Sequence, residues 1–365
     1  MKQTNYAFKI LYVLGIVFVV AGHCSYGGIS IGYDWFIPHA FHLGLFMFIS
    51  GYFYDKTAEE RALKYIGYKF KKLIIPLYLW NLFYGVFVFL TKQAGFTMGE
   101  EFSLWNLFVA PITDGHQFIY NMAGWYVPSL FFAHTVNVLF RKILGKLSLH
   151  NDWLVEGVYL CIGMAGVYLA MRGHNTGVWL PIARLAYFLP FYGLGTLYRN
   201  RLEGKVRIPR IVYFGIIMVV QLLIITVNKG VTAYYPSWCR DFDSVYMPFL
   251  AGACGIFFWL GISKLLEPVV GKSKYVLLVA EHGYSIMINQ FLGFFLVKGL
   301  FAFANKFLHV FGSFSWEGFL NDVWYYYLPG GLSQWLIVYL IAGIVVPVLI
   351  GMGLDKLRKK LFGKA

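Results

Sequence analysis

Two apolar stretches near the start of the chain decide its fold: FKILYVLGIVFVVAGH at residues 8–23 and FIPHAFHLGLFMFISGYFY at residues 36–54. Each is long and apolar enough to cross a bilayer, which takes about 20 residues. Each also holds histidine inside the apolar run, at His23 in the first stretch and at His39 and His42 in the second. Because an ionisable side chain inside a span is costly, these positions are functional hypotheses from the outset.

The composition of the whole chain is that of a membrane protein. Of the 365 residues, 59% are hydrophobic and 13% are charged, and the mean hydropathy is +0.62. A soluble domain carries about 25% charged residues, so we expect an all-α polytopic protein with one transmembrane domain over residues 1–365, surrounded by membrane lipid. The net charge of +14 does not indicate nucleic acid as a partner, because the Lys and Arg residues lie in short clusters between apolar runs.

We expect about ten transmembrane helices, with both termini in the cytoplasm. With the N-terminus inside, 24 of the 31 Lys and Arg residues fall on the inner segments, as the positive-inside rule requires. The outer loops are more acidic and aromatic, and their aromatic residues either anchor the chain at the interface or stack on sugars. The expected spans are residues 8–28, 35–54, 73–91, 125–140, 153–171, 179–198, 211–228, 245–262, 276–302 and 332–353.

The histidines of the first two spans should lie at similar depth in the outer half of the membrane. At 1.5 Å per residue, His23 lies roughly 8 Å below the outer end of its span and His42 roughly 10 Å below the outer end of the next. His39 precedes His42 by three residues and shares its helical face. Each imidazole could instead be hydrogen-bonded within the bundle, but three at matched depth favour a site in which His23 and His42 are catalytic.

Basic residues mark a second candidate site. The segment KFKKLIIP at residues 69–76 places Lys69 and Lys72 on one helical face, with Lys71 between them, where a helix enters the membrane. Such a cluster can bind phosphates, although ordinary positive-inside charge explains it equally well. Arg184 lies inside the sixth expected span, where it needs a partner or a ligand. We expect these four residues to bind a cofactor.

The ninth expected span is interrupted by polar residues. Glu281 and His282 form a polar break before Gly283, and Asn289 and Gln290 follow within the span. No metal site is expected, because the four cysteines form no CxxC pair and have no metal-ligand spacing; they are Cys24, Cys161, Cys239 and Cys254.

Four stretches, in this order, resemble the membrane-bound acyltransferase-3 family, the bacterial integral-membrane O-acyltransferases of surface polysaccharides. They are VVAGH at 19–23, FHLGLFMFISGYF at 41–53, KFKKLIIP at 69–76 and GWYVPSL at 124–130. The resemblance implies acetyl-CoA as the donor, a hydroxyl of a surface or lipid-linked glycan as the acceptor, and a bacterial cytoplasmic membrane as the location. It also implies that His23 is the catalytic base and that Lys69 and Lys72 face CoA.

The chain departs from the family pattern at three places. Tyr12 stands where the family has an arginine, the basic pair is lysine rather than arginine, and YSIMINQ at 284–290 lacks the histidine that the family often has there. Lysine also lacks the bidentate fork with which arginine binds phosphate. The residues that we expect to bind the acceptor are Tyr12, His39, Trp125, Asn289 and Gln290.

Two other functions fit the same features. A transporter of a glycan or a small solute also uses polar residues within spans and broken helices, although the repeats common in transporters are not visible in this sequence. A catalytically inactive relative would explain the missing arginine. The sequence does not name the glycan, does not separate acetyl from succinyl transfer, and leaves open whether the chain forms a homodimer.

Overall fold

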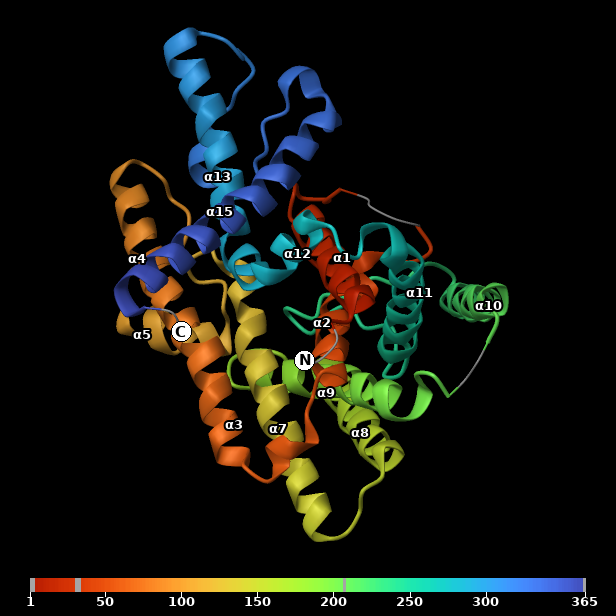
Figure 1. Cartoon of the computed structure of the whole chain (residues 1–365). Helices are drawn as coiled ribbons and strands as arrows, with labels where there is room; N and C mark the ends of the chain where they lie inside the picture. Colours follow the sequence, from red (N-terminus) through yellow and green to blue (C-terminus); the bar gives the residue numbers. More distant parts are fainter. Residues whose placement is uncertain (1–3, 30–33, 206–207, 364–365) are drawn as a thin grey trace.

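The computed structural model describes residues 4–29, 34–205 and 208–363, and within these ranges the chain is helical and contains no strand (Figure 1). Short 3₁₀ turns and two π-helical segments join the α-helices, and the π-helical segments are η3 Phe70–Ile74 and η5 Tyr198–Leu202. The α-helices are α1 Tyr6–Gly22, α2 His42–Tyr52, α3 Ala62–Lys69, α4 Ile75–Gln93, α5 Leu104–Phe108, α6 Ala110–Thr113, α7 Tyr126–Lys146, α8 Asp152–Met171, α9 Trp179–Leu197, α10 Arg210–Asn228, α11 Met247–Val270, α12 Lys274–Glu281, α13 Gly283–Leu308, α14 Trp316–Asn321 and α15 Leu336–Phe362.

The predicted class, an all-α polytopic membrane protein, is confirmed. Six helices in the described part of the chain are long and apolar enough to cross a membrane. Each of the ten expected spans overlaps a helix, and the ninth overlaps both α12 and α13; the others overlap α1, α2, α4, α7, α8, α9, α10, α11 and α15. The number of full crossings stays a prediction, because the 11 residues of α2 extend only about 17 Å of the roughly 30 Å of hydrocarbon.

The first two helices are shorter than the sequence predicts. Helix α1 ends at Gly22, where the chain turns back so that the Ile29 N–H donates to the carbonyl of Ala21 at 2.9 Å. Gly28 makes this turn with φ +68°, and a Cβ there would lie 3.0 Å from the Cα of Gly22. Helix α2 begins only at His42, after the 3₁₀ turn η1 Pro38–Ala40. The candidate histidines therefore lie at helix ends rather than in the middle of long helices.

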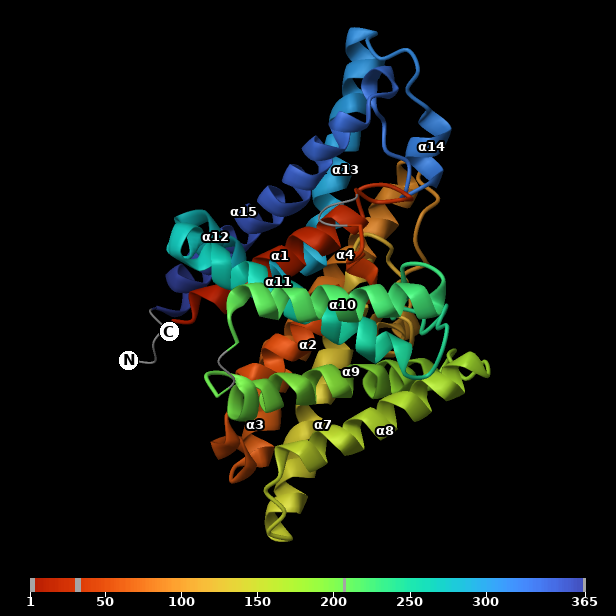
Figure 2. The ribbon, with the colours of Figure 1, turned by 90° about the vertical axis from the view of Figure 1, so that its right-hand side faces the viewer.

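The helices run between two ends of the bundle. The start of α1 and the end of α15 lie at one end, and the α8–α9 and α10–α11 connections turn at the other (Figure 2). We call these the termini end and the hairpin end. The cytoplasmic location of the termini stays a prediction, but their placement on one side is what an even number of crossings requires.

Helix α2 is fixed by unusually close packing on α9. A Cβ at Gly51 would lie 1.8 Å from the carbonyl oxygen of Tyr192, and one at Gly195 would lie 1.9 Å from that of Phe48. The hydroxyl of Thr196 donates to the carbonyl of Gly51 at 2.9 Å. Because the backbones touch, α9 determines the position of α2 and so of the histidine at its first turn.

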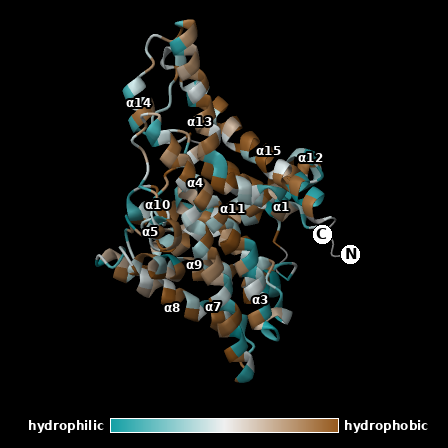
Figure 3. Cartoon of the chain, turned by 90° about the vertical axis from the view of Figure 1, so that its left-hand side faces the viewer, coloured by the Kyte–Doolittle hydropathy of each residue, from teal (hydrophilic) through white to brown (hydrophobic). Residues whose placement is uncertain are grey.

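Helix α1 lies between the two main apolar clusters. Phe8 and Phe18 belong to a cluster with residues of α2, α9 and α11, whereas Ile16 and Val20 belong to one with residues of α4, α13 and α15. The outward faces of the helices also remain apolar (Figure 3), with exposed residues such as Leu223 of α10. Extended apolar surface of this kind is expected where helices contact lipid.

Candidate active site

A cavity of about 940 Å³ lies between α1, α2, α7 and α13. At the hairpin end its wall includes Tyr26 and Trp238, and at the termini end it includes Ser50, Leu73 and Gly283. The structure brings six of the predicted site residues together in this wall, and they are Tyr12, His23, His39, His42, Trp125 and Gln290.

His23 is the C-cap residue directly after α1, and it is held at two points. Its ring Nδ1 lies 3.0 Å from Oε1 of Gln290 on α13, and the Tyr326 hydroxyl donates to its backbone carbonyl. The imidazole also packs against Phe291, with ring centroids 5.1 Å apart, and against Trp324 at 6.1 Å. Tyr326 thereby satisfies one of the carbonyls that a helix C-terminus leaves unpaired.

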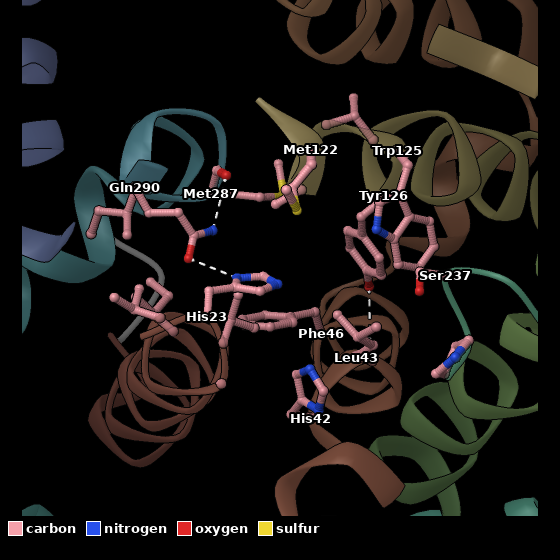
Figure 4. Close-up of a pocket in the computed structure, with 18 of the residues that line it drawn as sticks. His23, His42, Leu43, Phe46, Met122, Trp125, Tyr126, Ser237, Met287 and Gln290 are labelled. Atoms are coloured by element: carbon pink, nitrogen blue, oxygen red, sulfur yellow. Dashed lines mark hydrogen bonds between the residues drawn. The ribbon is translucent and has the colours of Figure 1, made fainter. Parts of the chain in front are cut away.

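The amide of Gln290 fixes the tautomer of His23. Its Nε2 donates to the carbonyl of Met287 at 3.2 Å, so Oε1 is the atom that faces the imidazole. A carbonyl oxygen only accepts hydrogen bonds, and His23 must therefore carry its proton on Nδ1. The other ring nitrogen, Nε2, keeps its lone pair and points away from Gln290 on the side of Met122 (Figure 4).

The two histidines of the second expected span lie beside this group. His42 opens α2, and its Nδ1 donates to the carbonyl of Pro38. The His39 ring meets the His42 ring edge to face at 5.5 Å, and a Cβ on Gly22 would lie 3.6 Å from the His39 ring. The 3₁₀ turn η1 thus places the His39 ring between two neighbours. One is Gly22, the residue before His23, and the other is His42.

Tyr12 occupies the part of the wall toward the termini end. Its ring packs edge to face on Phe46 at 5.3 Å, and a Cβ at Gly283 would lie 2.4 Å from its hydroxyl oxygen. Tyr12 and His23 both lie in the cavity wall and are separated by eleven residues, which is about 17 Å along a helix axis. The cavity therefore extends over most of the length of α1.

Arg184 lies at the hairpin end, behind the wall. Its side chain is 1% exposed and donates to the backbone carbonyls of Ser237 and Asp114, each at 2.9 Å. The guanidinium also lies 4.5 Å from the centre of the Trp125 ring. The structure does not bring Arg184 near the lysine cluster, and its contacts instead fix Trp125 and the loop that carries Ser237.

The lysine cluster lies at the termini end, beside the cavity rather than in its wall. Lys69 Nζ is 3.1 Å from Nε2 of His134 on α7. Lys71 and Lys72 are exposed on the π-helical segment η3, and the next residue of this segment, Leu73, lies in the cavity wall. Two exposed ammonium groups at this rim fit a phosphate-bearing ligand whose other end enters the cavity.

Asn289 and Gln290 separate into different roles. Asn289 is fully buried outside the described cavity wall, where it accepts a hydrogen bond from the Tyr84 hydroxyl at 2.6 Å and donates to Ser285. It therefore ties α13 to α4, whereas its neighbour Gln290 faces His23. Substrate binding by Asn289 stays a prediction without support from this placement.

The sequence analysis missed a histidine–carboxylate pair at the hairpin end. His116 lines the cavity, its Nδ1 lies 2.9 Å from Asp114, and its ring stacks on Trp238 at 4.2 Å. The hydrogen bond from His116 lowers the pKa of the Asp114 carboxyl, while burial lowers the pKa of His116 itself. The signal was the triplet Asp114-Gly115-His116 just before Trp125, with Gly115 at φ +86°.

Fold and site together define an integral-membrane helical protein with an oriented histidine in the wall of a cavity that reaches toward both ends of the bundle. The chain matches the family model described as an acyltransferase domain over residues 5–352, nearly its full length, so it belongs to the acyltransferase-3 family and is an acyltransferase. Comparison with curated proteins and with solved structures gives no match for this chain.

Proposed function

We propose that this protein transfers an acetyl or another short acyl group from acyl-CoA to a hydroxyl of a cell-surface or lipid-linked glycan, in the bacterial cytoplasmic membrane. The observation that carries the proposal is the free Nε2 of His23, which the Gln290 contact leaves as an acceptor inside the cavity. A glycan hydroxyl is a weak nucleophile at neutral pH and needs such a base to attack a carbonyl.

The residues of the chain supply proton transfer and positioning. CoA supplies the acyl group as a thioester, and Lys71 and Lys72, with Lys69 beside them, are placed to hold its phosphates at the termini end. As the acceptor oxygen bonds to the acyl carbon, Nε2 of His23 takes the hydroxyl proton. Gln290 Oε1 accepts from Nδ1 throughout and stabilises the imidazolium. When the carbon–sulfur bond breaks, the same proton passes to the departing sulfur, which leaves the base neutral again.

The two ends of the cavity suit the two substrates. The termini end carries the exposed lysines, and the hairpin end presents aromatic side chains, among them Tyr26, Tyr235 and Trp238. Aromatic faces pack well on the C–H faces of sugars, so the hairpin end is where we place the glycan. A reaction site between them joins a cytoplasmic donor to an acceptor on the other side without moving either substrate across the membrane.

His23→Ala tests the proposal. Removing a positioned general base lowers the rate by about 10²–10⁴, so acyl transfer should fall by that factor at an unchanged amount of protein in the membrane. The measurement is the acyl mass on glycans, by mass spectrometry, together with the CoA thiol released by purified protein in liposomes.

The glycan mass also separates the alternatives. A transporter would change where the glycan is found but not its mass, and an inactive relative would change neither. Transfer by His23→Ala at the wild-type rate would remove His23 from the chemistry.

A further inference from the structure

The cavity wall carries no formal charge. Among the described residues that line it there is no Asp, Glu, Lys or Arg. The wall consists of aromatic and aliphatic side chains with four imidazoles, a few hydroxyl groups and the amide of Gln290.

Apart from Lys71 and Lys72 at the rim, three cations close to the cavity make their contacts outside it. Arg184 lies behind Trp125 and donates to main-chain carbonyls. Lys69 is paired with His134. Lys298 is 4% exposed, donates to the carbonyl of Val323, and lies 4.3 Å from the centre of the Tyr326 ring. None of the three is part of the cavity wall.

From this uncharged wall we infer that the transferred acyl group is itself uncharged, an acetyl group or a short alkyl homologue, and that a succinyl group is excluded. The inference rests on the proposed function, since it names the substrate class of the same cavity. A succinyl carboxylate lies three carbon–carbon bonds beyond the thioester carbonyl. With that carbonyl beside His23, the carboxylate would lie among side chains such as Phe46, Met122 and Met287.

Burying a carboxylate without a cationic partner is strongly unfavourable, whereas a methyl group matches these apolar walls. The imidazoles do not supply the missing cation. Nδ1–H of His42 donates to the carbonyl oxygen of Pro38, and Nδ1–H of His23 donates to the amide oxygen of Gln290. Both of these acceptors are neutral. His116 already faces the carboxylate of Asp114. His39 packs against His42 and Tyr235.

The experiment compares acetyl-CoA, propionyl-CoA and succinyl-CoA with the purified protein in liposomes at pH 8, where an ordinary imidazole, with a pKa of about 6.5, is uncharged. We expect the specificity constant for succinyl-CoA to be at least tenfold below that for acetyl-CoA. Equal specificity constants for the two donors would overturn the inference. Consumption of no thioester at all would instead overturn the proposed function, so the two failures are distinguishable.

A binding measurement gives a readout that does not depend on turnover. Calorimetry with His23→Ala compares free CoA, acetyl-CoA and succinyl-CoA. We expect acetyl-CoA to bind more tightly than CoA, because its methyl group enters the cavity, and succinyl-CoA to bind no more tightly than CoA. Succinyl-CoA binding as tightly as acetyl-CoA would contradict the inference.

A charge placed in the wall should reverse the preference. Met287→Lys adds an ammonium near His23, and Met287→Gln is the uncharged control of similar length. We expect the ratio of succinyl-CoA to acetyl-CoA affinity to rise at least tenfold in the Lys variant only. An equal ratio in both folded variants would mean that the missing cation does not set the specificity. If the Lys variant does not fold, the wild-type comparison decides alone.

Discussion

At the scale of single residues, the proposed chemistry depends on how one imidazole is oriented. His23 is held through its ring by Gln290 and through its backbone carbonyl by Tyr326. These contacts leave one nitrogen free in a defined direction, so no reorganisation is needed before it accepts a proton. Because the partner at Nδ1 sets the tautomer, we propose that Gln290 positions His23 and does not itself react.

Gln290→Leu tests this positioning role. We expect the turnover number to fall by about tenfold, the effect of losing a hydrogen bond worth about 1.4 kcal/mol, with little change in the KM for acyl-CoA. Gln290→Glu keeps an oxygen acceptor for Nδ1–H and should restore much of the rate. Steady-state kinetics of both variants at matched protein amounts measure the difference. If Leu and Glu at this position give the same rate, the contact with His23 is only structural.

The sequence predicted some of these residues and not others, for a geometric reason. His23, His39 and His42 stood out because imidazoles are rare within apolar runs. Asn289 and Gln290 could not be ranked, since neighbouring helical residues point about 100° apart and only packing decides which one faces a cavity. His116 lies outside the apolar runs, so no such contrast marked it.

At the scale of helices, His23, His42 and Gly283 of the site lie at the ends of helices rather than within uninterrupted spans. Helix α1 ends at Gly22 with His23 as its C-cap, α2 begins at His42, and α13 begins at Gly283 after the break at His282. The sequence predicted this last break from Glu281 and His282. It overestimated the lengths of α1 and α2, because hydropathy records apolar residues whether or not they are helical. The turns around Gly28 and Pro38 are themselves apolar.

Gly51→Ala tests how α2 is held. Its methyl group would lie 1.8 Å from the Tyr192 carbonyl, and overpacking of this kind typically costs about 1–3 kcal/mol. We expect a lower thermal unfolding temperature in detergent and reduced transfer, because His42 moves with α2. Gly157→Ala on α8 is the matched control, since nothing lies within 4 Å of the added methyl group and alanine favours a helix by about 1 kcal/mol. Equal destabilisation by the two variants would refute the packing argument.

At the scale of the whole molecule, the cavity connects two chemically different ends. Exposed Lys71 and Lys72 lie near the termini end, and Trp238 stacked on His116 lies at the hairpin end. The sequence predicted the membrane class and the acyltransferase-3 family because both depend on composition and on motifs of neighbouring residues, which can be read without the fold. It could not predict the cavity, which forms between helices that are distant in sequence and follows from close contacts such as that of α2 with α9.

The arrangement predicts that the acyl donor reaches the enzyme from only one side of the membrane. Acyl-CoA does not cross membranes, and the proposed donor site at the lysines puts its entry at the termini end, which charge asymmetry predicts to be cytoplasmic. Inverted membrane vesicles should therefore use acetyl-CoA added outside them, and right-side-out vesicles should not until they are permeabilised. Equal use by both kinds of sealed vesicle would contradict either the orientation or the donor site.

Changing Lys71 and Lys72 together to Ala separates these two explanations. We expect the double variant to raise the KM for acetyl-CoA by about tenfold at low salt with little change in turnover number, because in the proposed donor site the ammonium groups bind phosphates and take no part in proton transfer. Salt screens such exposed contacts, with a Debye length of about 3 Å at 1 M, so the difference from wild type should shrink as ionic strength rises. Lys64→Ala, an exposed lysine on α3, is the control for general surface charge. If the double variant and the wild type have the same KM at low salt, Lys71 and Lys72 do not bind the donor and serve only as positive charge on the cytoplasmic side.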